Sequence, residues 1–163
     1  GLSKSFSSFG AFITCTDDAM KDLFRSASTF IFSGPSPVAS LASALAGLEL
    51  NSAEGDVWRA QVYKLTHRLV NGAKEMGYEV VNQNYFPIVG VVIGTTEDVI
   101  MACKVLWEYG ILITPAIYPI VPMDRGLLRF SITAANTEEE IERSLEALAA
   151  VRRKMNKEVL EVA

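Results

Sequence analysis

The run Pro87-Ile-Val-Gly-Val-Val-Ile-Gly94 constrains the fold of this chain more than any other segment. Apart from its glycines and the leading proline, every residue in it is β-branched. A continuous β-branched run is typical of a strand that lies inside a sheet. We therefore expect residues 87–94 to form a central strand, and the chain must supply helices to cover it.

The segments around this run have helical periodicity. In residues 54–76 apolar residues recur every three or four positions, and Gly77 follows directly, as in a left-handed C-terminal cap. A second helix is expected from Thr96 to Gly110, and a third opens with the capping box of residues 137–140.

Two short strands, at residues 111–114 and 127–133, are expected between the last two helices, separated by a proline-rich loop. From about residue 53 onward the order is therefore helix, strand, helix, strand, strand, helix. This order indicates an α/β fold in which a small sheet packs against helices.

The first 50 residues do not fit the same unit. The apolar segments 10–14 and 29–33 are expected to be short strands, the first of them buried. Asp17 and Asp18 are expected to cap a helix between them. Residues 38–50 are rich in alanine and leucine and nearly uncharged, so we expect a helix that is buried on most sides.

Composition excludes several classes of function. The chain has 163 residues, of which 50% are hydrophobic, so it can bury a core and is not a disordered protein. A net charge of −4 argues against a nucleic-acid partner held through its phosphates. The longest charge-free apolar stretch, residues 109–123, is interrupted by prolines, so we expect no membrane span and no signal peptide. The cysteines Cys15 and Cys103 are expected to be buried thiols in a reducing cytosol.

Three polar features are candidates for chemistry. Lys4 precedes an apolar segment, where a desolvated amine could form a Schiff base, although most such lysines are solvated charges. Arg129 lies inside an apolar strand and needs either an anionic ligand, an internal ion pair or access to water. The loop Ser33-Gly-Pro-Ser-Pro37 could hold a phosphate or be a plain turn.

Other kinds of site are not indicated. His67, the only histidine, is expected at the surface of its helix, and it is poorly placed for a catalytic triad. The sequence contains no cluster of histidines, cysteines and carboxylates with metal-ligand spacing, so no metal site is expected.

Read together, four motifs resemble those of the α-oxoamine synthases, which are pyridoxal-phosphate (PLP) enzymes of fold type I. These motifs are Gly1-Leu-Ser-Lys-Ser-Phe6, Gly10-Ala-Phe-Ile13, Phe30-Ile-Phe-Ser33 and Leu128-Arg-Phe-Ser-Ile-Thr-Ala-Ala135. The resemblance implies the C-terminal part of such an enzyme, beginning almost at its cofactor lysine. Residues 1–50 would be a strip of the large PLP-binding domain, and residues 51–163 the small α/β domain.

The resemblance also assigns residue roles. It implies that Lys4 is the catalytic lysine that carries PLP covalently and that Ser3 belongs to the same cofactor segment. Ser33 and the Gly34 N–H would hold the phosphate of the cofactor bound to a neighbouring subunit. Arg129 would bind the carboxylate of the substrate. Asn136 stands where the family usually has a histidine.

The implied reaction condenses an amino acid with an acyl-CoA to give an α-oxoamine, in a cytoplasmic homodimer. The segment alone is expected to be inactive, because most cofactor ligands of the family precede the lysine. Two alternatives remain at this point. One is a fragment of a class I or II aminotransferase, and the other is a non-catalytic α/β module that binds a partner or senses a small ligand.

Overall fold

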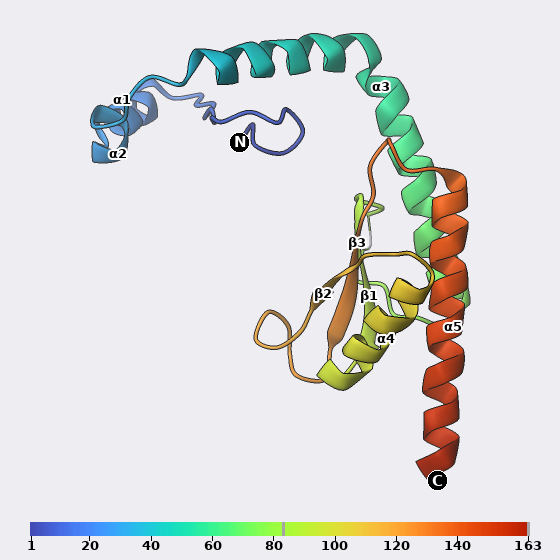
Figure 1. Ribbon diagram of the computed structural model, residues 1–163. Coiled ribbons are helices and arrows are strands. Elements are labelled where there is room, and N and C mark those ends of the chain that lie inside the picture. The colour runs from blue at the N-terminus through green and yellow to red at the C-terminus, as the bar shows by residue number, and fades with distance from the viewer. Residues whose placement is uncertain (83, 163) are drawn as a thin grey trace. The chain divides into compact units, whose positions relative to one another are not determined.

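The computed structural model describes residues 1–82 and 84–162, and their side chains as far as Asn156. The chain forms two compact units, Gly1–Asp56 and Val57–Ala163. The long helix α3 (Val38–Glu75) contributes residues to both (Figure 1). The assignment of residues 1–50 to a large domain and 51–163 to a small one remains a prediction.

The second unit is built on a three-stranded antiparallel sheet. Its strands are β1 (Ile88–Gly94), β2 (Thr114–Ala116) and β3 (Gly126–Ser131), in the order β1-β3-β2. The sheet confirms the expected α/β class, but β3 rather than β1 is central. The outer side of β1 is partly covered by residues 79–81, since Val81 N–H donates to Gly90 O at 2.9 Å.

One face of the sheet carries the core. Buried side chains alternate with more exposed ones along both long strands, so Val89, Val91, Leu128 and Phe130 point to the same face. The helices α4 (Thr96–Glu108) and α5 (Glu138–Val162) and the second half of α3 supply the rest of the core (Figure 1). Within this unit the core therefore covers one face of the sheet.

Local signals in the sequence fix the helix ends of this unit as expected. Thr95 and Asp98 form a capping box at the start of α4. At the start of α5, Glu140 N–H donates to Thr137 Oγ1 at 3.2 Å. Gly77 has a φ of 80°, which a glycine adopts without steric cost just after a helix.

Two expectations about where elements begin and end differ from the structure. The strand expected at residues 111–114 is found at Thr114–Ala116 instead, and Pro115 lies within it. A proline is tolerated there because β2 is an edge strand, with no further strand beside it among the described residues. The helices expected at residues 38–50 and 54–76 are one continuous helix, because no proline separates them.

The first unit contains no strand among the described residues. Residues 10–14 form no hydrogen-bonded ladder, and residues 28–31 form the short helix α2 (Ser28–Ile31). Both predictions of strands are wrong here because a strand exists only when a neighbour pairs with its backbone, and a helix satisfies its own. The capped helix after Asp17 is confirmed as α1 (Asp18–Ser26), with Ala19 N–H donating to Asp17 Oδ1 at 2.8 Å.

The expected burial of the first unit is also wrong. Val38 is 81% exposed and Leu45 is 59% exposed on the part of α3 that was expected to be buried. Cys15 in this unit and Cys103 in the second unit are free thiols that are only half-buried. Large exposed apolar side chains extend over the unit; they include Phe9, Phe12, Ile13, Phe30, Ile31 and Phe32.

Candidate functional site

Lys4 lies in a loop that backbone hydrogen bonds close on itself. Leu2 N–H donates to Gly10 O at 2.8 Å, and Ser8 N–H donates to Leu2 O at 3.1 Å. A turn inside the loop is closed by Ser7 N–H, which donates to Lys4 O at 3.2 Å. These bonds hold the backbone on both sides of the lysine.

The beginning of α3 anchors this loop from within the same unit. Ser8 Oγ donates to Ser40 O at 2.5 Å, and Ser43 Oγ donates to Phe6 O at 3.1 Å. The Phe6 ring lies so close to Gly47 that a Cβ at position 47 would overlap Phe6 Cδ1. Gly47 therefore allows the close approach that packs the loop on the helix.

The side chains of Ser3 and Lys4 point to solvent. Both residues are exposed, and the Lys4 amine has no ion pair or hydrogen bond within the described part of the chain. The desolvated strand end that was expected beside Lys4 is absent, because residues 10–14 do not pair into a sheet. What the structure provides is an accessible primary amine on an anchored loop.

Ser33 and Gly34 follow α2 in an open turn. Ser33 Oγ donates to Phe30 O at 2.8 Å, and the backbone N–H of Ser33 donates to the same oxygen at 3.2 Å. A Cβ at Gly34 would meet nothing within 4 Å. The backbone at Gly34 is therefore approachable by a ligand.

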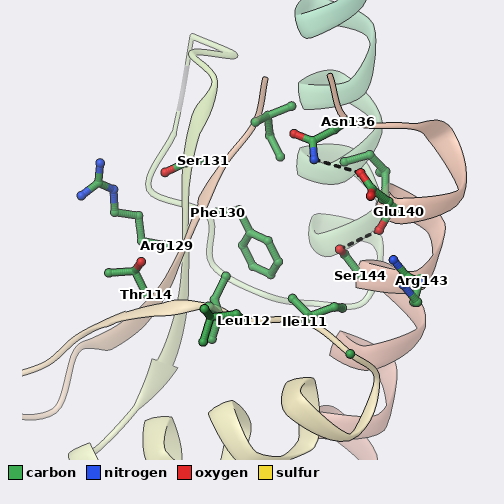
Figure 2. Close-up of a pocket in the computed structure, with 14 residues that line it drawn as sticks. Ile111, Leu112, Thr114, Arg129, Phe130, Ser131, Asn136, Glu140, Arg143 and Ser144 are labelled. Atoms are coloured by element: carbon green, nitrogen blue, oxygen red, sulfur yellow. Dashed lines mark hydrogen bonds between the residues drawn. The ribbon is translucent and has the colours of Figure 1, made fainter. Parts of the chain in front are cut away.

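Arg129 lies on the outward face of the sheet in the second unit. It falls between the buried Leu128 and Phe130, and it is exposed because successive strand residues point to opposite faces. Figure 2 shows its guanidinium directed away from Phe130. The guanidinium makes no ion pair with any side chain that the structure describes, so the internal ion pair considered from the sequence is not formed.

Cross-strand partners flank Arg129 on both sides. In the antiparallel ladders it pairs with Gly90 of β1 and with Thr114 of β2. A cavity of about 480 Å³ opens on the Gly90 side, and we call it the Arg129 cavity. Sequence patterns alone did not indicate Gly90 or Thr114, because only the register of the strands brings them beside the arginine.

A second cavity, of about 300 Å³, lies between the end of β3 and α5 (Figure 2). Asn136 Nδ2 donates to Glu140 Oε2 at 2.9 Å, and Asn136 Oδ1 accepts from Thr133 N–H at 2.8 Å. The hydrogen bonds from Asn136 and from Thr137 N–H hold the pKa of the Glu140 carboxyl below its usual value. Asn136 thus organises the start of α5, and its amide is occupied by protein groups.

His67 was expected to be an ordinary surface residue, and the structure differs from this expectation. It is half-buried, and its ring stacks on Tyr85 with the ring centroids 4.1 Å apart. Its Nδ1 lies 2.8 Å from Asn71 Nδ2.

The candidate residues divide between the two units. Ser3, Lys4, Ser33 and Gly34 belong to the first unit, and Arg129 belongs to the second. Within residues 1–82 and 84–162 no group of three or more histidine, cysteine or acidic side chains could hold a metal ion. In the same part of the chain no helix has both the length and the apolarity to cross a membrane.

Comparison with known families identifies the relatives of this chain. The model of the family "Aminotransferase class I and II" matches residues 1–148. The chain is 34% identical over 149 residues to 8-amino-7-oxononanoate synthase of Stutzerimonas stutzeri, covering 91% of this chain and 37% of that protein. It is 30% identical to serine palmitoyltransferase of Bacteroides ovatus, covering 90% of this chain and 37% of that one.

Solved structures resemble the same segment. Serine palmitoyltransferase of Sphingomonas wittichii matches with a TM-score of 0.82 and 24% identity, covering 95% of this chain and 39% of that chain. 8-Amino-7-oxononanoate synthase of Francisella tularensis matches with a TM-score of 0.79 and 23% identity, covering 97% of this chain and 45% of the other. The chain thus spans about two fifths of the length of these relatives and has the fold of that part of PLP enzymes of fold type I.

Proposed function

Since the chain belongs to the class I and II aminotransferase family, we propose that it is the C-terminal part of a PLP-dependent acyltransferase. The enzyme would join the Cα of an amino acid to the acyl carbon of an acyl-CoA. The thioester bond breaks and CoA leaves, and loss of CO2 or a proton from Cα completes the α-oxoamine. The observation that carries this proposal is the accessible amine of Lys4, on an anchored loop, in a chain that is 34% identical to an 8-amino-7-oxononanoate synthase. Residues 1–50 would belong to the large cofactor domain and residues 51–163 to the small domain.

The residues of the first unit fit part of the cofactor. The Lys4 amine suits the aldehyde carbon of PLP, and the Ser33 hydroxyl and the Gly34 N–H suit its phosphate as donors. When bound, the cofactor supplies an electron sink for negative charge at the substrate Cα. The Lys4 amine would move a proton between its Nζ and that carbon.

Arg129 fits the substrate carboxylate. A guanidinium offers two parallel N–H donors that match the two oxygens of a carboxylate. At Arg129 this fork is exposed and carries no protein ion pair among the described side chains, so a ligand meets no competing carboxylate. Its role is to orient the amino acid, because a fixed carboxylate fixes which bond at Cα faces the reacting groups.

The apolar surface of the first unit supports a larger assembly. Phe12 is 71% exposed and Phe32 is 87% exposed, and stable proteins rarely leave large apolar patches open to water. We infer that the remainder of a longer chain and a second subunit cover this surface in a homodimer. The two free thiols favour a reducing compartment such as the cytoplasm.

The test uses the full-length protein with PLP, reduced with borohydride and mapped by peptide mass spectrometry. We expect the reduced adduct on Lys4, its loss in Lys4→Ala, and CoA release that needs both an amino acid and an acyl-CoA. Lys21→Ala is the matched control, because Lys21 is another lysine of this unit and its amine pairs with Asp18 at the surface.

Each contrary result selects another function. Transfer of the amino group to a 2-oxo acid, without CoA release, would indicate an aminotransferase. The absence of any adduct from the full-length protein would indicate a non-catalytic module and refute the proposal.

A further inference from the structure

The Arg129 cavity has a wall that is unusually apolar for a surface that surrounds a cation. Its volume is about 480 Å³, and Val81, Phe86, Ile88 and Leu127 line it together with two asparagines. Among the described residues that line it, Arg129 has the only charged side chain. Such a cavity suits a carboxylate that carries an uncharged group beside it, because a second charge would find no partner there.

Gly90 forms the open part of this cavity. It lies directly opposite Arg129 in the β1–β3 ladder, and side chains at such paired positions stand next to each other on one face of a sheet. The missing side chain at position 90 therefore leaves room beside the guanidinium. A Cβ there would lie 3.4 Å from Leu127 Cδ2 and 3.6 Å from Val81 Cβ, which are contacts that a protein accommodates.

The backbone gives no other reason for this glycine. Gly90 lies outside the left-handed region, unlike Gly77, Gly94 and Gly110. A glycine inside a strand weakens the strand, and it commonly marks a place where another group comes close. The space itself is thus the property that distinguishes Gly90.

The opposite wall is held in place by Asn82. Its Nδ2 donates to Phe86 O and to Ile88 O, the latter at 3.0 Å, and its Oδ1 accepts from Asn84 N–H at 3.1 Å and Phe86 N–H at 3.2 Å. These bonds use both donors and both lone pairs of the amide. The position of Phe86, 67% exposed at the edge of the cavity, therefore depends on Asn82.

We propose that Gly90 is a specificity-determining residue, which sets the size of the uncharged group that a carboxylate ligand bound at Arg129 can carry, and that Asn82 is a positioning residue for the facing wall. This inference rests on the proposed function, because it takes the ligand to be an amino acid bound through its carboxylate. It adds the residues that select among amino acids.

The experiment measures binding of glycine, alanine, serine and leucine to the full-length protein with PLP and without acyl-CoA, by calorimetry. Steady-state kcat and KM for the same amino acids give a second readout. The variants are Gly90→Ala, Gly90→Val and Asn82→Asp. Val92→Ile is the matched control, since Val92 lies on the same face of β1 but does not line the cavity.

We expect Gly90→Val to raise the Kd of the largest amino acid that binds, relative to glycine, about tenfold, which corresponds to about 1.4 kcal/mol. Gly90→Ala should shift the same ratio by a smaller factor, and Val92→Ile should leave it unchanged. Asn82→Asp places an oxygen against two carbonyl oxygens, so it should reduce discrimination among the amino acids while glycine still binds.

Arg129→Ala separates this inference from the proposed function. If that variant binds every amino acid as tightly as the native protein, the proposed role of Arg129 fails, and the role of Gly90 fails with it. If Arg129→Ala weakens binding but both Gly90 variants keep the native size ratio, only the role of Gly90 is refuted. An equal loss for glycine and the larger amino acids in Gly90→Val refutes size selection as well.

Discussion

Replacement of Gly126 by alanine tests how tightly the sheet packs on α4. Gly126 begins β3 and is buried, and a Cβ there would lie 2.7 Å from Val99 Cγ2 and 2.9 Å from Gly94 O. Carbon atoms in contact normally stay about 3.5–4.0 Å apart. The Gly94 carbonyl is backbone and cannot rotate away, so the strand itself must shift. Overpacking typically costs about 1–3 kcal/mol, and we expect about 3 kcal/mol for Gly126→Ala.

The assay is native-state hydrogen exchange of the backbone amides of β1 and β3 in the full-length protein. A loss of about 3 kcal/mol corresponds to exchange that is roughly a hundredfold faster. Gly90→Ala is the control, because its added Cβ comes no closer than 3.4 Å, to the end of the Leu127 side chain. If Gly126→Ala changed exchange no more than Gly90→Ala did, the packing argument would be refuted.

Two further predictions concern buried hydroxyl groups of the second unit. Thr66 is fully buried, and its Oγ1 has no hydrogen-bond partner among the described residues. Thr66→Val should therefore raise the free energy of unfolding by about 1 kcal/mol. Urea unfolding measures this, and Thr66→Ser, which keeps the hydroxyl, is the comparison. Tyr78 donates its hydroxyl to Leu148 O at 2.8 Å, and burial raises the pKa of Tyr78 to about 12 although the nearby Arg152 acts to lower it. An unfolded tyrosine has a pKa of about 10, so the folded state binds this proton more tightly. The stabilisation that Tyr78 gives to the folded state is therefore complete below about pH 10 and is lost as the pH rises towards 12. The urea concentration at the unfolding midpoint should fall over this pH range, and Tyr78→Phe should remove the part of that fall that is due to Tyr78.

Helix ends were predictable from the sequence because the signals that set them are local. The capping boxes at Thr95 and Thr137 and the glycine at position 77 all act on neighbours within one helical turn. The same reasoning wrongly expected the helix to end after residue 50. The alanine-rich segment carries no local signal that ends a helix, and α3 continues through it.

Strands were predicted less well because a strand depends on its partner. Residues 29–33 have the composition of a strand, yet α2 forms there with Phe32 N–H donating to Ser28 O at 3.0 Å. Residues 88–94 do form a strand, since β3 is available to pair with it. The composition of a segment shows only that it would fit a pleated, partly buried surface. Whether it forms a strand depends on whether another segment of the chain pairs with it.

For the candidate site, the sequence indicated residue types and not their neighbours. Arg129 was noticed because a cation inside an apolar run is unusual, but the sequence left open whether it is paired, buried or exposed. The register of β3 with β1 settles this, because it puts Arg129 on the outward face opposite a glycine. Asn82 carried no signal at all, since its role depends on a loop that only the fold closes.

The outward face of the sheet connects these observations to function. An antiparallel sheet with one covered face normally places polar side chains on the other. Here the outward face carries the apolar side chains of Ile88 and Leu127 around Arg129, which forms no ion pair with any described side chain. The exposed apolar side chains are unfavourable in water, because nothing among the described residues covers them. The guanidinium beside them has no carboxylate partner among the described side chains. A ligand that brings a carboxylate and an uncharged group would satisfy both at once, and this is the argument for our proposal that an amino acid binds on this face of the sheet.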